Sequence, residues 1–202
     1  MVKDKNTEQR IYEAARKVFL KKGMAGARMQ EIADEAGINK ALLHYYFRNK
    51  EKLFDGIFNE VIERISTGIQ SIFELETNVL EKLKEFVNIY VDVLFENRYL
   101  PLFVLNEMNQ HPDRFSILLK ENIVVHMKKF LVQIQEEIEN GTIRAENPVH
   151  LLLSVLGLII FPFAVYPLFK KMFSEELMED TDILLIERKK EICLFIENAL
   201  KP

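Results

Sequence analysis

The sequence has a single cysteine, Cys193, no tryptophan, and only 7 glycines and 6 prolines among 202 residues. One cysteine excludes an internal disulfide and any metal site built from several cysteines, and it favours a reducing compartment. The low glycine and proline content excludes collagen-like and linker-like chains. The polar residues 1–14 lack the apolar core of a signal peptide, so we expect a cytoplasmic protein.

Charge is distributed unevenly along a chain that is 49% apolar and 29% charged. The whole chain carries a net charge of −4, but residues 1–52 contain 12 basic and 7 acidic side chains, which gives 12 − 7 = +5 and leaves −9 for the remainder. A basic segment joined to an acidic body suggests a nucleic-acid contact confined to one end. Small charge imbalances also arise by chance, so sequence motifs have to decide whether the basic segment binds nucleic acid.

Apolar residues recur with helical spacing through nearly the whole chain, and no stretch alternates as a half-buried strand does. The chain is therefore predicted to be all-α. We place the first helix from an N-cap at Asn6, with Gln9 completing a capping box, to a stop at Gly23. A long amphipathic helix is expected to follow an N-cap at Asn49.

Two short helices are predicted around Gly37, one over residues 29–36 and one from an N-cap at Asn39 to about Phe47. Their spacing is that of a helix-turn-helix. Ala33 is small enough for the helices to cross closely, and Gly37 can supply the positive φ that a tight turn needs.

The second of these helices presents one face that is free to enter a DNA major groove. The residues expected to contact DNA there are Asn39, Lys40, Ala41, Leu42, His44 and Tyr45. Phosphate contacts are also expected from Arg28 and Lys50. Leu42 could meet a thymine methyl or be buried between helices, and His44 could read a base or lie on the surface.

Residues 6 to about 58 resemble the DNA-binding domain of the tetracycline-repressor (TetR) family, through the segments RIYEAARKVFLKKG and MQEIADEAGINKALLHYYFRNKEKLF. The resemblance implies a dimeric transcriptional regulator whose helical C-terminal domain binds a small ligand and changes the spacing of two DNA-reading heads. Ala27 and Arg28 stand where the family usually has a Ser or Thr helix cap, so Arg28 can instead reach a phosphate. His44 replaces a frequent Tyr, which makes Tyr45 the stronger phosphate contact.

We expect a helix-turn-helix domain over residues 1–52 and an effector-binding and dimerisation domain over residues 53–202. The body is rich in phenylalanine and methionine, 15 and 7 residues in the chain, and a deformable apolar interior suits a lipophilic effector. Polar residues set among apolar neighbours are the candidates for orienting that ligand. They are Tyr90, Asn106, Glu107 and His126.

Residues 151–169 form a nearly unbroken apolar run of 19 residues, long enough to span a membrane. Pro162 and Pro167 and the amphipathic neighbours on both sides argue against a span, and Pro162 is expected to kink or break the helix. The TetR resemblance implies that this region and the last helix form the homodimer interface. We predict no membrane contact.

No pattern in the sequence points to catalysis, to a cofactor or to a metal, because the four histidines are scattered and no phosphate-binding glycine loop or HExxH pair is present. The prediction is a ligand-responsive regulator, acting as a repressor, that binds palindromic double-stranded DNA as a homodimer. The alternatives are a membrane-surface helical module and an enzyme with a buried apolar pocket.

Overall fold

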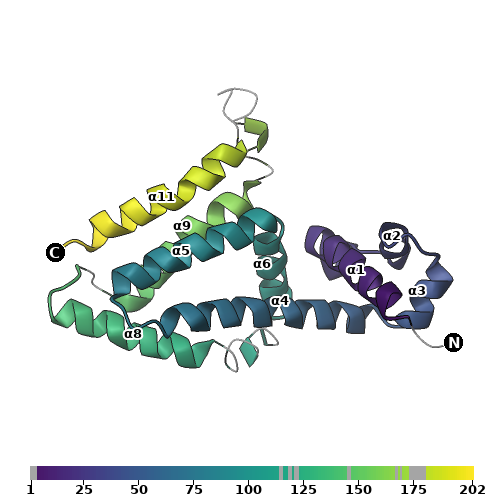
Figure 1. Ribbon diagram of the computed structural model, residues 1–202, viewed down its shortest axis with the longest axis horizontal. Coiled ribbons are helices and arrows are strands. Elements are labelled where there is room, and N and C mark those ends of the chain that lie inside the picture. Colours follow the sequence, from purple (N-terminus) through teal and green to yellow (C-terminus); the bar gives the residue numbers. More distant parts are fainter. Residues whose placement is uncertain are drawn as a thin grey trace. The chain divides into compact units, whose positions relative to one another are not determined.

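A computed structural model describes residues 4–113, 116, 117, 120, 123–144, 147–166, 168, 170–172 and 181–202. These residues contain helices and no strand, which confirms the predicted all-α class. Figure 1 shows the helices in chain order. They are α1 (Lys5–Gly26), α2 (Met29–Glu35), α3 (Lys40–Tyr46), α4 (Lys50–Phe73), α5 (Val79–Glu96), α6 (Leu100–Gln110), α8 (Val124–Glu139), α9 (Pro148–Ala164) and α11 (Thr181–Leu200).

The helices form two compact units. The first unit comprises Met1–Ile65 and Phe103–Phe115, and the second comprises Ser66–Leu102 and Ser116–Pro202. Helices α4 and α6 therefore contribute residues to both units.

Helix α1 begins earlier than the sequence pattern predicted. Asp4, not Asn6, is the N-cap, because the Asp4 carboxylate accepts hydrogen bonds from the backbone N–H groups of Asn6 (3.1 Å) and Thr7 (3.3 Å). A further bond of 2.8 Å from the Thr7 hydroxyl helps to hold the pKa of Asp4 below its usual value. At Gly23, with φ +66°, the helix kinks, and a final short segment continues to Gly26.

The predicted N-cap of α4 is confirmed, and α8 and α9 also have well-formed ends. The Asn49 side chain caps α4 by accepting from the N–H groups of Glu51 and Lys52 at 2.8 and 3.1 Å. Asn147 caps α9, with Pro148 at the first helical position. Gly141, with φ +69°, follows the C-cap of α8.

The first unit has an aromatic core between α1, α4 and α6. The ring of Phe54 meets Phe19 edge-on at 5.0 Å and stacks on Phe58 at 6.0 Å. Phe103 of α6 lies 5.6 and 5.7 Å from these two α4 rings. Because all four side chains are buried, they fix α1 and α6 on the N-terminal half of α4.

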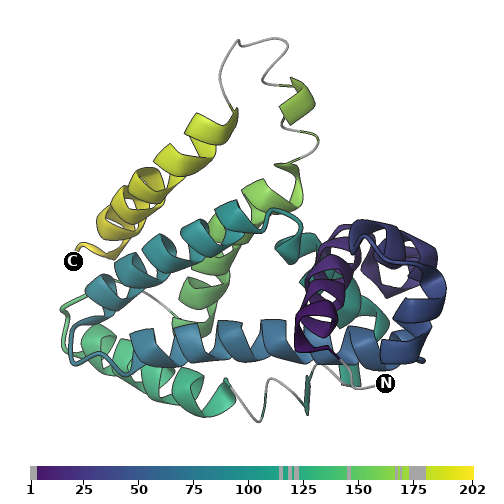
Figure 2. The ribbon, with the colours of Figure 1, turned by 45° about the vertical axis from the view of Figure 1, so that its right-hand side comes forward.

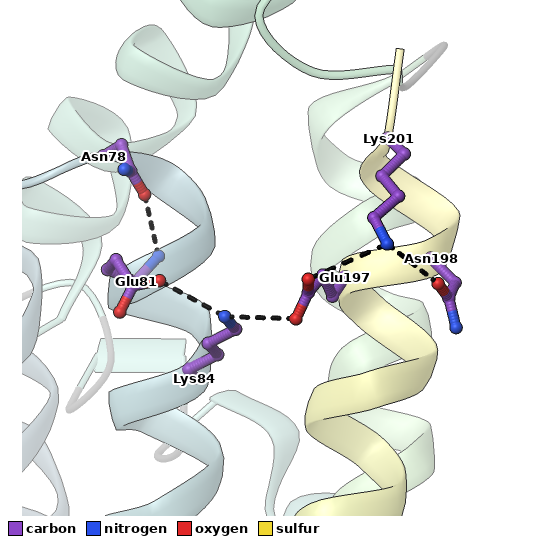
Figure 3. Close-up of polar contacts among 6 residues, drawn as sticks. All are labelled: Asn78, Glu81, Lys84, Glu197, Asn198 and Lys201. Carbon is purple, nitrogen blue, oxygen red and sulfur yellow. Dashed lines mark hydrogen bonds and ion pairs between the residues drawn. The ribbon is translucent and has the colours of Figure 1, made fainter.

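In the second unit, α5 packs along α11 and also contacts α8 and α9, as the blue-green, green and yellow ribbons of Figure 2 show. Polar contacts line the seam between α5 and α11. Lys84 of α5 bridges Glu81 and Glu197 at 3.3 Å each, and Lys201 lies 3.8 Å from Glu197 (Figure 3). Exposed pairs of this kind add little stability, so buried side chains hold this seam.

The apolar run over residues 151–169 lies largely in α9. The helix passes through Pro162 and ends two residues later, at Ala164. The predicted break therefore comes close to the helix end, where few backbone hydrogen bonds remain to be lost. Among the described residues, no helix is both long enough and apolar enough to cross a bilayer. Pro167 lies outside the described residues.

Candidate DNA-binding site

The turn between α2 and α3 has the geometry of a helix-turn-helix. Gly37 adopts φ +64°, and the Ile38 N–H donates a 3.0 Å hydrogen bond back to the carbonyl oxygen of Ala33. Asn39 then caps α3, since its side-chain oxygen accepts from the Leu42 N–H at 2.8 Å. The predicted positive φ of Gly37 and the predicted N-cap at Asn39 are confirmed, and Ala33 is fully buried as the close crossing requires.

Helix α3 has one buried and one exposed face. Leu43 is fully buried and Tyr46 is 8% exposed, so these two side chains anchor the helix. The other face is open to solvent along its length. The exposed residues there, the N-cap included, are Asn39, Lys40, Ala41, His44 and Tyr45. This arrangement leaves the predicted DNA face unobstructed within the first unit.

The remaining predicted DNA contacts differ in how far their side chains are exposed. Arg28 is exposed at the N-cap of α2 and makes no side-chain cap, as its replacement of Ser or Thr suggested. Leu42 is half-buried, so neither of its two predicted roles is excluded. Lys50 opens α4 and is half-buried. Tyr45 packs edge-on against Tyr46, which holds its ring at the surface.

Several basic side chains of the first unit are engaged within the protein. Lys17 pairs with Glu35 at 3.2 Å and Lys22 with Glu31 at 2.8 Å, both between α1 and α2. In the described part of the chain, Arg28, Lys40 and Lys50 form no ion pair, so their charges remain available to phosphate.

The prediction did not include Arg48 among the contacts, although it is exposed in the loop between α3 and α4. A cation next to the recognition helix was the signal that could have identified it. Lys52, exposed in the first turn of α4, extends the same basic edge.

A polar link joins α1 to α4 within the first unit. The Tyr12 hydroxyl hydrogen-bonds Glu60, and Arg16 lies 3.5 Å from the same carboxylate. Burial, and then the charge of Glu60, raises the pKa of Tyr12 to about 12. A Cβ at Gly56 would lie 3.3 Å from the Tyr12 hydroxyl oxygen, so this glycine allows the close approach.

The four predicted ligand residues divide between the two units. In the second unit, the Tyr90 ring packs on Phe86 at 4.5 Å, and burial raises the pKa of its phenol. His126 Nδ1 lies 3.2 Å from a carboxylate oxygen of Glu74. In the first unit, Asn106 is exposed and Glu107 is 4% exposed. The four residues are therefore not gathered within one unit.

Tyr90 and His126 border one aromatic cluster of the second unit. The ring of Phe73 stacks on that of Phe130 at 4.3 Å and lies 6.1 Å from that of Phe86. The Tyr90 ring packs against the other neighbour of this cluster, Phe86. His126 precedes Phe130 by one turn of α8. The interior beside these two polar groups is thus aromatic.

A groove of about 330 Å³ separates α9 from α11. Leu151, Val155 and Leu158 line one side, and Phe195 and Ile196 line the other. Phe195 is 59% exposed, so an apolar ring stands at the rim. No group of three or more metal-ligating side chains occurs among residues that the structure describes.

Residues 11–57 match the family model described as "Bacterial regulatory proteins, tetR family". The chain is similar to the "Probable HTH-type transcriptional regulator YttP" of Bacillus subtilis, with 28% identity over 193 residues, 85% of this chain and 90% of that protein. It is also 28% identical to the "HTH-type transcriptional repressor NicS" of Pseudomonas putida over 117 residues, 58% of this chain and 49% of that protein.

Among solved structures, the fatty acid degradation regulator FadR from Bacillus halodurans is similar over 95% of this chain and 96% of that chain. The TM-score is 0.61 at 21% sequence identity, which shows a shared fold. These matches give no support to the alternative of a membrane-surface module.

Proposed function

Because the chain belongs to the TetR family of bacterial transcriptional regulators, we propose that it represses transcription by binding a palindromic operator as a homodimer and that a lipophilic effector changes this binding. The observation that carries the proposal is the exposed face of α3, whose N-terminal end presents Lys40 and Ala41 beside a capped, well-anchored helix start. In helix-turn-helix proteins this end of the recognition helix reads base edges.

Contacts divide by chemistry into base readers and phosphate binders. Ala41, Leu42 and His44 are the proposed base readers, Ala41 and Leu42 through apolar contact with thymine methyl groups. Charged and hydroxyl groups around them suit phosphate oxygens. The proposed phosphate contacts are Arg28, Asn39, Lys40, Tyr45 and Lys50.

The proposed dimer interface is the apolar surface of α9 and α11. Both helices expose large apolar side chains that a second copy of the chain could cover. They are Val149, Leu153 and Phe161 on α9, and Ile183, Ile186, Leu194 and Phe195 on α11. A symmetric pairing of this surface with a second copy would bury it and present two recognition helices to DNA.

A lipophilic effector fits the composition of the second unit. Phe73, Phe86 and Phe130 offer apolar contacts, and Tyr90 and His126 offer hydrogen bonds at the edge of the cluster. Asn106 and Glu107 of α6 belong to the first unit and stay predictions apart from this cluster. FadR from Bacillus halodurans, which shares the fold, is a fatty acid degradation regulator, and this favours an effector of similar character.

The effector acts by favouring one separation of the two DNA-binding heads. In a dimer the recognition helices must lie about one turn of DNA apart, roughly 34 Å, or a multiple of it. A ligand shifts that spacing only by as much as its affinity differs between the two arrangements. Helix α4, which contributes to both units, is the proposed lever. We propose a cytoplasmic regulator with no enzymatic activity and no cofactor.

Selection from a random pool of DNA duplexes tests the proposal. Wild-type protein is expected to enrich an inverted repeat, whose two halves reflect the symmetry of the dimer. Enrichment of a single unrepeated motif would refute binding of the operator by a symmetric dimer. Absence of any enrichment at low salt would refute operator binding altogether.

A further inference from the structure

The side chain of Arg10 reaches from α1 to the turn between α2 and α3. Its Nη2 atom donates a 2.7 Å hydrogen bond to the carbonyl oxygen of Ala36, which is 26 residues away in the sequence. Ala36 is the C-cap of α2. Carbonyl groups at a helix C-terminus lack partners within the helix and carry the negative end of its dipole, so a guanidinium is a well-matched donor.

Gly37 leaves the space that this bond needs. A Cβ on Gly37 would lie 3.3 Å from Nη2 of Arg10. The glycine thus serves both the positive φ of the turn and the close approach of the arginine. Asn39, the cap of α3, follows two residues later, so Arg10 fixes the backbone directly before the recognition helix.

The other end of α3 is also bound to α1. The hydroxyl oxygen of Tyr46, the last residue of α3, accepts a 2.9 Å hydrogen bond from the backbone N–H of Asp4. Asp4 is the N-cap of α1, and Arg10 lies in the second turn of the same helix. The beginning of α1 therefore holds the recognition helix at two points, before its first turn and at its last residue.

We propose that Arg10 and Tyr46 are positioning residues for operator recognition, through which α1 fixes the orientation of α3. The proposal rests on the proposed function, because only a specific operator makes the orientation matter. Base contacts demand correct distance and direction, whereas attraction to phosphates extends over a Debye length and tolerates displacement. Loss of either hydrogen bond should therefore weaken operator binding much more than binding to unrelated DNA.

The test compares Arg10→Met and Tyr46→Phe with the matched control Lys17→Met, whose lysine also lies on α1 but pairs with Glu35. Affinities for the selected operator and for a scrambled duplex are measured at several salt concentrations, at a temperature where circular dichroism shows every variant folded. We expect Arg10→Met to lose about tenfold in operator affinity. Binding to the scrambled duplex should stay within about twofold of wild type, with an unchanged salt slope.

One further variant, Arg10→Lys, and the comparison with Tyr46→Phe separate positioning from mere stability. Arg10→Lys should restore part of the operator affinity, because an ammonium can also donate to the Ala36 carbonyl. Tyr46→Phe keeps the buried ring and removes only the hydroxyl, so it should show the same selective loss as Arg10→Met. Lys17→Met should match wild type on both duplexes apart from a small charge effect.

The outcomes are distinguishable. Equal weakening on both duplexes, with a salt slope reduced by about one, would make Arg10 a phosphate contact and overturn the proposal. Wild-type operator affinity in both Arg10→Met and Tyr46→Phe would overturn it while leaving the proposed function intact. A wild-type protein that does not discriminate the operator from the scrambled duplex would refute both.

Discussion

The Nζ atom of Lys82 donates a 2.8 Å hydrogen bond to the carbonyl oxygen of Phe73, the last residue of α4. The same atom donates to the side-chain oxygen of Gln133 at 2.7 Å and lies 5.7 Å from the centroid of the Phe130 ring. Lys82 is only 5% exposed. A single buried ammonium thus joins the C-terminal end of α4 to α5 and α8 in the second unit.

Replacing Lys82 tests how much this junction stabilises the second unit. Lys82→Met keeps the length of the side chain but leaves the Phe73 carbonyl and Gln133 without their donor, which should cost about 1–3 kcal/mol. Urea denaturation measures the loss. Lys84→Met is the control, because its half-exposed ion pairs should contribute less than about 1 kcal/mol. An equal cost for both variants would contradict the importance of the junction.

Tyr12 should make the first unit sensitive to alkali. Burial beside Glu60 raises its pKa from 10.0 to about 12, so between these values the unfolded chain loses a proton that the folded chain retains. The stability contributed by the phenol is complete below pH 10 and is lost as the pH rises through 12.

Thermal unfolding across this pH range, compared between wild type and Tyr12→Phe, checks the expectation. Tyr12→Phe has no phenol to ionise and should show a smaller fall in melting temperature with pH. Identical slopes in the two proteins would place the alkaline loss elsewhere.

Lys50 and Tyr45 should differ in the salt dependence of their contributions. Lys50→Ala removes a charge and should weaken binding to every duplex while lowering the salt slope by about one. Tyr45→Phe removes a neutral hydroxyl and should weaken binding without changing that slope. Affinity titrations at several salt concentrations measure both effects, with Lys17→Ala as the control. Wild-type behaviour in both variants would show that DNA meets a different surface.

The apolar surface of α9 and α11 should hold the dimer together. The double variant Phe161→Asp, Phe195→Asp places two charges on side chains that are 60% and 59% exposed, so each protomer should still fold. Sedimentation should then detect a folded monomer with weakened operator binding. Val132→Asp alters an equally exposed apolar residue of α8 and should leave the dimer intact. A double variant that sediments as a dimer would exclude this surface.

The features of the fold that depend on residues close together in the sequence could be predicted. The caps at Asn39 and Asn49 and the positive φ of Gly37 depend on residues at most three positions apart, and all three are as predicted. The N-cap of α1 was misplaced because Asn6 and Asp4 are both good caps. Asp4 prevails since its backbone N–H is also bound by Tyr46, a contact that local sequence does not reveal.

Long-range contacts limited the prediction of the site. The exposed face of α3 followed from helical periodicity, because burial of Leu43 and Tyr46 turns the remaining side chains outward. The bond from Arg10 to Ala36 spans 26 residues, and the bond from Lys82 to Gln133 spans 51. Both residues read as ordinary surface cations in the sequence. For the same reason, polar character alone could not place Tyr90 and Asn106 in one unit.

Binding stoichiometry measured by sedimentation on two duplexes tests the central claim most directly. One duplex carries the complete selected inverted repeat and the other carries a single half of it. The account predicts two protein chains on the complete repeat and much weaker binding to the half site, because each recognition helix reads one half. One chain bound to the complete repeat, or equal affinity for the two duplexes, would contradict it.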